Sequence, residues 1–343
     1  MHTDKKFDGT IHVAVAGAGR MGTHHARIYS QIEGCRLVGV CDHHRERAQK
    51  LSQEYGCRAF ESVEELLNSG ETLHAATVAV PTVSHREVAE KFLTSDVDLL
   101  IEKPLAPDVA DARAIISAAE KNHRVLQVGH SERFNPVVRA LAGYELEPRF
   151  VEVHRISPMT FRSIDIGVVL DMMIHDIDIV NYFVRSEVKS VAAAGVAVLG
   201  KFEDVANARI VFANGCVANL TASRLALKTE RKMRLFSPNA YISVDYQKKA
   251  GVVIRKTANE QQLEMVRKKI AAGEVADLTD LNYTELVNYE QLQIQDTEPL
   301  RVEIESFLKT VRTRRRPEVS GQDGLFAVDV ATRITEAIAA NAQ

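Results

Sequence analysis

Paired cysteines are missing from this sequence. Its four cysteines, Cys35, Cys41, Cys57 and Cys216, show no C-x-x-C spacing, and three of the four stand in or beside apolar, strand-like runs. This pattern favours reduced thiols in a cytoplasmic protein over a zinc site or a disulfide framework.

Long apolar runs and an excess of one charge are missing as well. No segment reaches the roughly 18 uninterrupted apolar residues of a membrane helix, and the first nine residues, MHTDKKFDG, contain no apolar core of a signal peptide. Lys and Arg number 43 against 46 Asp and Glu, for a net charge of −3. Such a balance gives no general attraction to nucleic acid or anionic lipid. We expect a cytoplasmic protein whose partners are small molecules and copies of itself.

The most informative segment that is present covers residues 11–22, IHVAVAGAGRMG. An apolar strand leads into a G-x-G-x-x-G motif: Gly17, Ala18, Gly19, Arg20, Met21 and Gly22. Gly17 permits a tight turn, Gly19 lets the backbone approach a pyrophosphate, and Gly22 lets helix and strand pack closely. Asp42 ends a second strand, where a carboxylate binds ribose hydroxyls. The combination predicts a dinucleotide cofactor, and a glycine-rich turn of another α/β protein is the alternative.

Strand and helix signals alternate through the first 130 residues. The predicted strands cover residues 11–16, 36–41, 77–80, 98–102 and 125–129. The predicted helices cover residues 22–31, 45–55, 63–67, 85–94 and 109–121. This alternation is typical of a doubly wound parallel sheet. We therefore expect an α/β Rossmann domain over residues 1–134.

The pattern changes after about residue 135. Alternating runs predict strands of a large, mostly antiparallel open sheet at 150–156, 188–199, 207–212, 217–225, 233–236, 241–246 and 252–256. Helices are predicted at 164–184, 299–312 and 325–340, with a helix-and-loop excursion at 259–282. We expect an α+β domain over residues 135–320, whose uncovered sheet face forms a homo-dimer or homo-tetramer. A C-terminal helix over residues 321–343 is expected to pack back on the first domain.

Ligands of open parallel sheets bind beyond the carboxyl ends of the strands. Polar residues follow three predicted strands at such positions: Pro81, Thr82 and His85; Glu102, Lys103 and Pro104; Arg133 and Asn135. The residue before a proline avoids the α region, so Pro104 holds Lys103 extended and directs its ammonium into the cleft. An ordinary surface lysine beside a loop proline is the alternative.

The predicted helix at 164–184 carries a polar stripe of Asp171, His175, Asp178 and Tyr182 on one face. Burying such groups on an otherwise apolar helix requires polar partners or a cavity. Asp171 precedes His175 by one turn, close enough for the carboxylate to orient the imidazole and raise its basicity. The alternatives are a structural Asp–His pair and a divalent metal site, for which no third strong ligand appears at matching spacing.

Three motifs together resemble the Gfo/Idh/MocA oxidoreductases, the family of glucose–fructose oxidoreductase and inositol dehydrogenase. They are G-A-G-R-M-G, E-K-P at 102–104, and D-x-x-x-H-x-x-D at 171–178. The resemblance covers nearly the whole chain, because P-E-V-S-G-Q-D at 317–323 is similar to the family's C-terminal segment. Taken singly, only E-K-P and the Asp/His helix discriminate among Rossmann enzymes.

The resemblance implies NAD-dependent hydride transfer without a metal. By this resemblance, Lys103 contacts the reacting hydroxyl, His175 is the general acid/base, and Asp171 completes the catalytic set. It also implies a cofactor site of Gly17, Gly19, Arg20, Met21, Gly22, Asp42, Pro81, Thr82, His85, Glu102 and Lys103. Asp42 would select NAD, although its basic neighbours His43, His44 and Arg45 leave tolerance for a 2′-phosphate.

Within the family, G-H-S-E-R-F-N-P at 129–136 with M-I-H-D-I-D at 173–178 resembles the bacterial UDP-N-acetylglucosamine 3-dehydrogenases. The implied function is oxidation of the 3-hydroxyl of that nucleotide sugar, with substrate contacts from Lys103, Arg133, Asn135, Arg162 and His175.

One departure is Met173, where many family members have glycine; its bulk puts the fit of the substrate in question. Arg155 and Arg162 lie on the segment before the helix, where surface arginines in solvent are the alternative. Two other functions stay open: a same-family dehydrogenase of a free sugar or cyclitol, and a catalytically silent NAD(P)-binding regulator.

Overall fold

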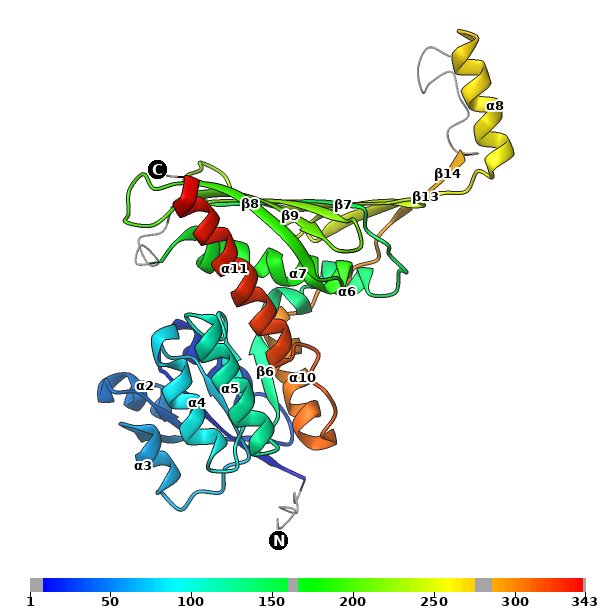
Figure 1. The fold of residues 1–343 in the computed structure, drawn as a ribbon. Helices are drawn as coiled ribbons and strands as arrows, with labels where there is room; N and C mark the ends of the chain where they lie inside the picture. The colour runs from blue at the N-terminus through cyan, green and yellow to red at the C-terminus, as the bar shows by residue number, and fades with distance from the viewer. Residues whose placement is uncertain (1–8, 160–165, 275–285, 342–343) are drawn as a thin grey trace. The chain divides into compact units, whose positions relative to one another are not determined.

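A computed structural model gives the structure of residues 9–159, 166–274 and 286–341. The chain forms two units (Figure 1): residues 1–134 with 297–333, and residues 135–296 with 334–343. Residues 297–320, assigned to the second domain from the sequence, thus belong to the first unit. The reason is long-range packing, because Ile304, Phe307 and Val311 join the apolar core of the first sheet.

The first unit is built on a six-stranded parallel sheet in the order β3-β2-β1-β4-β5-β6. Its strands are β1 (Ile11–Ala16), β2 (Cys35–Cys41), β3 (Arg58–Phe60), β4 (Ala75–Val78), β5 (Asp98–Glu102) and β6 (Leu126–Gly129). The sheet confirms the predicted Rossmann architecture. Strand β3 was not predicted, because three residues are too few for a periodic signal.

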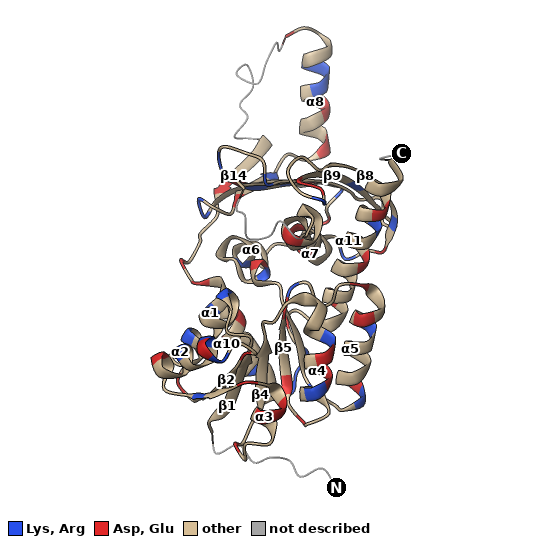
Figure 2. Cartoon of the chain, turned by 90° about the vertical axis from the view of Figure 1, so that its left-hand side faces the viewer, with Lys and Arg blue, Asp and Glu red and all other residues tan. Residues whose placement is uncertain are grey.

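Helices cover both faces of this sheet. They are α1 (Arg20–Tyr29), α2 (Arg45–Tyr55), α3 (Val63–Leu67), α4 (His85–Leu93), α5 (Val109–Lys121), α10 (Pro299–Thr313) and the first part of α11 (Gly321–Asn341). The apolar side chains on the two faces of the sheet form two separate cores. Leu100 of β5 packs in the core with α1 and α10, whereas Leu99 and Ile101 pack in the core with α4 and α5. Charged residues lie on α2, α4 and α5, whereas β1 and β4 carry none (Figure 2).

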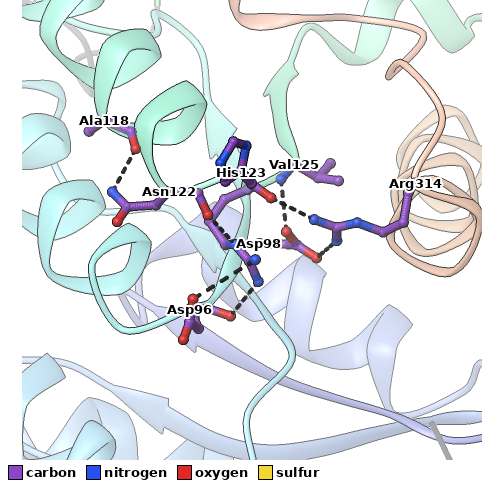
Figure 3. A network of polar contacts seen from close by, with 8 residues as sticks. Asp96, Asp98, Ala118, Asn122, His123, Val125 and Arg314 are labelled. Atoms are coloured by element: carbon purple, nitrogen blue, oxygen red, sulfur yellow. Dashed lines mark hydrogen bonds and ion pairs between the residues drawn. The ribbon is translucent and has the colours of Figure 1, made fainter. Parts of the chain in front are cut away.

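The C-terminal end of α10 is tied to the beginning of β5 (Figure 3). Arg314 has a left-handed backbone (φ 55), donates to the Asp98 carboxylate, and donates to the His123 carbonyl at 2.8 Å. Asp98 also accepts from the Val125 amide at 2.8 Å. Burial raises the pKa of Asp98, and the nearby Arg314 acts in the opposite direction. This end of β5 is therefore held by an ion pair that crosses from sheet to helix.

The second unit is built on an eight-stranded sheet in the order β14-β13-β12-β11-β7-β10-β9-β8. Its strands are β7 (Phe150–Ile156), β8 (Val188–Val196), β9 (Val205–Phe212), β10 (Val217–Ser223), β11 (Glu230–Ser237), β12 (Ala240–Asp245), β13 (Ala250–Lys256) and β14 (Val287–Gln291). Neighbours pair antiparallel apart from β7 and β10, which are parallel. The predicted α+β domain with a mostly antiparallel sheet is confirmed, and β14 is an additional edge strand.

Helices α6 (Pro136–Leu141) and α7 (Ile174–Val184) lie along one face of this sheet (Figure 1). A π-helical turn, η3 (Val169–Met173), precedes α7, so the helix predicted at 164–184 is not one continuous α-helix; residues 164–165 lie outside the described residues. Helix α8 (Glu260–Ala271) has no buried residue and extends away from the sheet. A bilayer-crossing helix, which would have to be both long and apolar, is absent from the described parts of the chain.

Candidate cofactor and active site

Two of the three motif glycines in the turn after β1 stand where a side chain would not fit. Gly17 has a φ of +99, and a Cβ there would lie 2.4 Å from the carbonyl oxygen of Ala79. A Cβ on Gly22 would lie 1.7 Å from the carbonyl oxygen of Gly17, whereas a Cβ on Gly19 would meet nothing within 4 Å. The open space at Gly19, at the beginning of α1, fits the close approach of a pyrophosphate.

Asp42 is fixed beside this turn by backbone amides. Its Oδ2 accepts a hydrogen bond from the Ala18 amide at 2.7 Å, and its Oδ1 accepts one from the His44 amide at 2.8 Å. Its side chain is only 6% exposed. The carboxylate that directly follows β2 is thereby oriented at the glycine-rich turn, as binding of an adenosine ribose requires.

A cavity of about 500 Å³ lies at this edge of the sheet. Its lining includes Gly17, Gly19, Asp42, Val80 and Pro81, from the ends of β1, β2 and β4. The volume is within the range of roughly 300–1,000 Å³ that small-molecule sites have. The chain's own residues therefore supply a glycine cradle, a ribose-directed carboxylate and a cavity where a dinucleotide would bind.

The basic residues near Asp42 differ from those expected. His43 and Arg47 line the cavity, whereas Arg45 pairs with Glu61 at 3.0 Å. Arg47 was missed from the sequence: it lies in the first turn of α2, which begins at Arg45, and no local motif marks it. Glu61 lines the cavity too, and it was missed because it follows the short strand β3.

Several expected cofactor residues do not line this cavity: Arg20, Met21, Gly22, Thr82, His85, Glu102 and Lys103. His85 is 1% exposed, with Nδ1 at 3.0 Å from the Pro104 carbonyl oxygen and Nε2 at 3.0 Å from that of Val80. Burial lowers its pKa. His85 therefore bridges the loops after β4 and β5, and its direct contact with the cofactor stays a prediction.

The expected catalytic residues belong to different units. Lys103 directly follows β5, is half-buried, and precedes Pro104 through a cis peptide bond. Asp171 lies within η3, and His175 is the second residue of α7; both are half-buried. Single π-helical turns of this kind are frequent at functional sites.

The beginning of α7 is anchored by a buried ion pair. The Arg155 guanidinium of β7 donates two hydrogen bonds of 2.8 Å to the Asp176 carboxylate, and the two side chains are 4% and 2% exposed. Arg155 is therefore not a solvent-facing arginine but the residue that holds the helix next to His175. Arg162 lies outside the described residues.

Two expected substrate residues have structural partners. Arg133 is 6% exposed and lies 4.0 Å from the Asp323 carboxylate. Asn135 caps α6 by accepting from the Val137 amide at 3.0 Å. Met173 is fully buried, so its side chain belongs to the packing beneath η3. Substrate contacts of Arg133 and Asn135 stay predictions.

Comparisons with known proteins agree with this geometry. A family described as "Oxidoreductase family, NAD-binding Rossmann fold" matches residues 11–130, and the GFO/IDH/MocA C-terminal domain matches residues 149–243. UDP-N-acetylglucosamine 3-dehydrogenase of Acidithiobacillus ferrooxidans is 33% identical, over 96% of this chain and 98% of its own. A solved structure of that enzyme matches with a TM-score of 0.85 and covers 97% of this chain and 99% of its own. Inositol 2-dehydrogenase of Rhizobium meliloti is 25% identical, over 97% of this chain and 98% of its own.

The first unit is thus an NAD-binding Rossmann domain. Its glycine turn and Asp42 are the residues that would hold the dinucleotide.

Replacing Asp42 with Ala is expected to weaken NAD binding by roughly 10- to 100-fold, because a carboxylate that accepts hydrogen bonds contributes about 1.5–3 kcal/mol. NADP, whose 2′-phosphate is repelled by the carboxylate, loses less or gains affinity. Isothermal titration calorimetry measures both affinities in a chain that has no Trp for fluorescence quenching. Glu46→Gln, which alters an exposed carboxylate of α2 outside the cavity lining, is the control and should leave the ratio unchanged. A wild-type preference for NADP would contradict the role of Asp42.

Proposed function

Because this chain belongs to the Gfo/Idh/MocA family of oxidoreductases, we propose that it oxidises the 3-hydroxyl of UDP-N-acetylglucosamine with NAD. The observation that carries the substrate is the 33% identity to a UDP-N-acetylglucosamine 3-dehydrogenase over nearly the full length of both chains. An inositol dehydrogenase reaches 25% over a similar span. Both substrates present a secondary ring hydroxyl, which is the group that the reaction consumes.

In the proposed reaction, the residues of this chain handle the hydroxyl proton and the developing charge. His175 takes the proton from the hydroxyl as general base, with Asp171 orienting the imidazole. Lys103 stabilises the negative charge that develops on the oxygen. NAD, when bound, supplies the two-electron acceptor for the hydrogen on the same carbon. The ion pair of Arg155 and Asp176 holds the first turn of α7, and with it the backbone of His175.

The nucleotide part of the substrate needs polar and cationic partners. We assign these contacts to Arg133, Asn135 and Arg162, because guanidinium groups bind diphosphates through paired hydrogen bonds. Arg133 and Asn135 lie four and six residues after the last residue of β6, on the segment that leaves the carboxyl edge of the first sheet. This is the edge at which open parallel sheets bind ligands.

The alternative substrate is a free sugar or cyclitol. The inositol dehydrogenase relative supports this reading, and the same proton and charge chemistry would serve it. A catalytically silent regulator is the weaker alternative, because it gives no reason for Lys103, Asp171 and His175 to occur together.

Self-association through the open sheet is part of the proposal. Phe150, Phe236 and Tyr241 alternate with buried neighbours and form an aromatic cluster on the face opposite α7, with centroid distances of 5.6 Å and 5.0 Å. Phe236 is 36% exposed. An apolar patch on an uncovered sheet face is typical of an interface between subunits.

Light scattering of the purified protein is therefore expected to give a mass of two or four copies of the 38.0 kDa chain. Phe236→Glu should shift the protein toward the monomer, because it puts a charge in the patch. Phe202→Glu, at an exposed phenylalanine outside the strands, is the control and should leave the mass unchanged. A monomeric wild type would rule the interface out.

Lys103→Ala and His175→Ala are each expected to lower kcat by roughly two to four orders of magnitude, since each removes a group that acts in the transition state. NAD affinity should stay within about twofold, because neither residue lines the nucleotide cavity. Absorbance of reduced nicotinamide at saturating substrate measures kcat, and calorimetry measures NAD affinity. Normal turnover in either variant removes that residue from the mechanism.

A thermal-shift screen that crosses NAD and NADP with UDP-sugars and inositols tests the substrate. Ligands that bind the folded state raise the unfolding temperature. UDP-N-acetylglucosamine with NAD is expected to raise it most and then to reduce NAD on incubation. Stabilisation and turnover with myo-inositol, but not with any UDP-sugar, would replace the nucleotide sugar with the cyclitol.

A further inference from the structure

A buried hydrogen bond joins the helix after the glycine turn to the strand that ends directly before Lys103. His25 lies on α1, and its Nε2 is 2.7 Å from Oε1 of Glu102, the last residue of β5. His25 is fully buried and Glu102 is 8% exposed. Neither side chain lines the cofactor cavity, so the nucleotide site alone does not account for this pair.

The surroundings of the pair fix both partners. Thr77 of β4 has its Oγ1 at 3.3 Å from Nδ1 of His25 and at 2.8 Å from the Tyr29 hydroxyl, so each imidazole nitrogen has a polar neighbour. On β6, a Cβ at Gly129 would lie 3.2 Å from the carboxyl group of Glu102. The glycine therefore leaves the space that the Glu102 side chain occupies.

A third titratable group faces the pair from another helix. Glu303 of α10 is fully buried, and a carboxylate oxygen of it lies within 4.8 Å of the His25 and Glu102 atoms. A divalent cation is one possible occupant of such a group. Ligands about 2.0–2.1 Å from a tetrahedral zinc ion lie roughly 3.3 Å apart, however, and 2.7 Å between Nε2 and Oε1 is the length of a charge-assisted hydrogen bond. The distance therefore favours a hydrogen bond between Nε2 of His25 and Oε1 of Glu102 over a cation bound by both atoms.

The bond has a directional consequence for the next residue. Successive side chains of a strand point to opposite faces, and Leu100 and Glu102 share the face covered by α1 and α10. With Glu102 held on that face, the backbone at the end of β5 is fixed in rotation. The direction in which Lys103 leaves the strand is fixed with it.

We propose that His25 and Glu102 are positioning residues for Lys103, and that their hydrogen bond links the dinucleotide-binding helix α1 to the lysine. This inference rests on the proposed role of Lys103 in oxidising a sugar hydroxyl. Neither residue touches a reacting atom. Loss of the bond therefore lowers turnover while NAD affinity and folding are kept.

Three variants test the proposal. Glu102→Gln keeps the shape of the side chain and removes its charge, and His25→Gln keeps an N–H donor near the position of Nε2. The double variant His25→Leu/Glu102→Leu removes both polar partners together, which avoids leaving one of them unpaired in the core. Asp98→Asn is the matched control, because it alters the other buried carboxylate of β5, which Arg314 holds at the opposite end of the strand (Figure 3).

Glu102→Gln and the double variant are expected to lower kcat by roughly 10- to 100-fold, because misplacing a positioned group by about 1 Å costs up to about 100-fold. The KM for the sugar, NAD affinity and unfolding temperature should change little. His25→Gln should recover turnover to within about fivefold of the wild type. Asp98→Asn should lower the unfolding temperature and leave kcat unchanged.

Labelling of Lys103 gives a readout that needs no sugar substrate. Limiting acetic anhydride followed by peptide mass spectrometry is expected to modify Lys103 at least threefold faster in the double variant than in the wild type, and equally in Asp98→Asn. Absence of turnover in the wild type, with the labelling result as expected, would refute the proposed function while keeping the positioning of Lys103.

Three results would overturn the inference. The first is a folded double variant whose kcat and Lys103 labelling are both unchanged. The second is a parallel fall of kcat and unfolding temperature in the double variant, without recovery of kcat in His25→Gln, and the third is one equivalent of zinc in the purified wild type.

Discussion

The close packing of backbone at the turn after β1, where Gly17 and Gly22 have no room for a side chain, is the constraint on which the cofactor site depends. Gly17 stands against the Ala79 carbonyl, and Gly22 stands against Gly17 itself. Because both positions are glycine, the turn between β1 and α1 packs closely against the Ala79 carbonyl and against itself. This close packing lets Asp42 reach the Ala18 amide and places His25, one turn after Gly22, beside the end of β5.

The two ends of β5 show how similar buried carboxylates serve different purposes. Asp98 begins the strand and is neutralised by Arg314 from the end of α10 (Figure 3). Glu102 ends the strand and binds His25. A buried charge requires a partner wherever it lies, so both contacts follow from burial alone. Their consequences differ because ligands of a parallel sheet bind only at the carboxyl edge, where Lys103 follows Glu102.

Local patterns in the sequence predicted most of the fold, because they are set by neighbouring residues. The G-x-G-x-x-G turn and the alternating runs located β1, β5 and β7 with their observed bounds. Contacts between distant residues were not predicted. The packing of α10 on the first sheet and the ion pair of Arg155 with Asp176 join segments whose approach no local period encodes.

The candidate site divides in the same way. Gly17, Gly19, Asp42 and Pro81 were predicted and line the nucleotide cavity, because motif spacing carries the information. Arg47 and Glu61 were missed, since their place depends on how α2 and β3 pack. His85 was expected at the cofactor; its ring lies against carbonyl oxygens of two loops, and a contact with the cofactor stays a prediction. A histidine at a strand end has the same signature whether it binds a ligand or supports a loop.

The chemistry and the specificity of such an enzyme are held by different parts of the chain. The proposed acid–base and charge-stabilising groups, His175 and Lys103, suit any secondary ring hydroxyl, so they do not distinguish a nucleotide sugar from a cyclitol. Met173, the departure from the family pattern two residues before His175, is fully buried. Its bulk therefore acts on the packing of η3 rather than on a ligand directly. Discrimination must then come from groups that recognise the parts of the substrate remote from the reacting carbon, which binding energy can use without changing the chemical step.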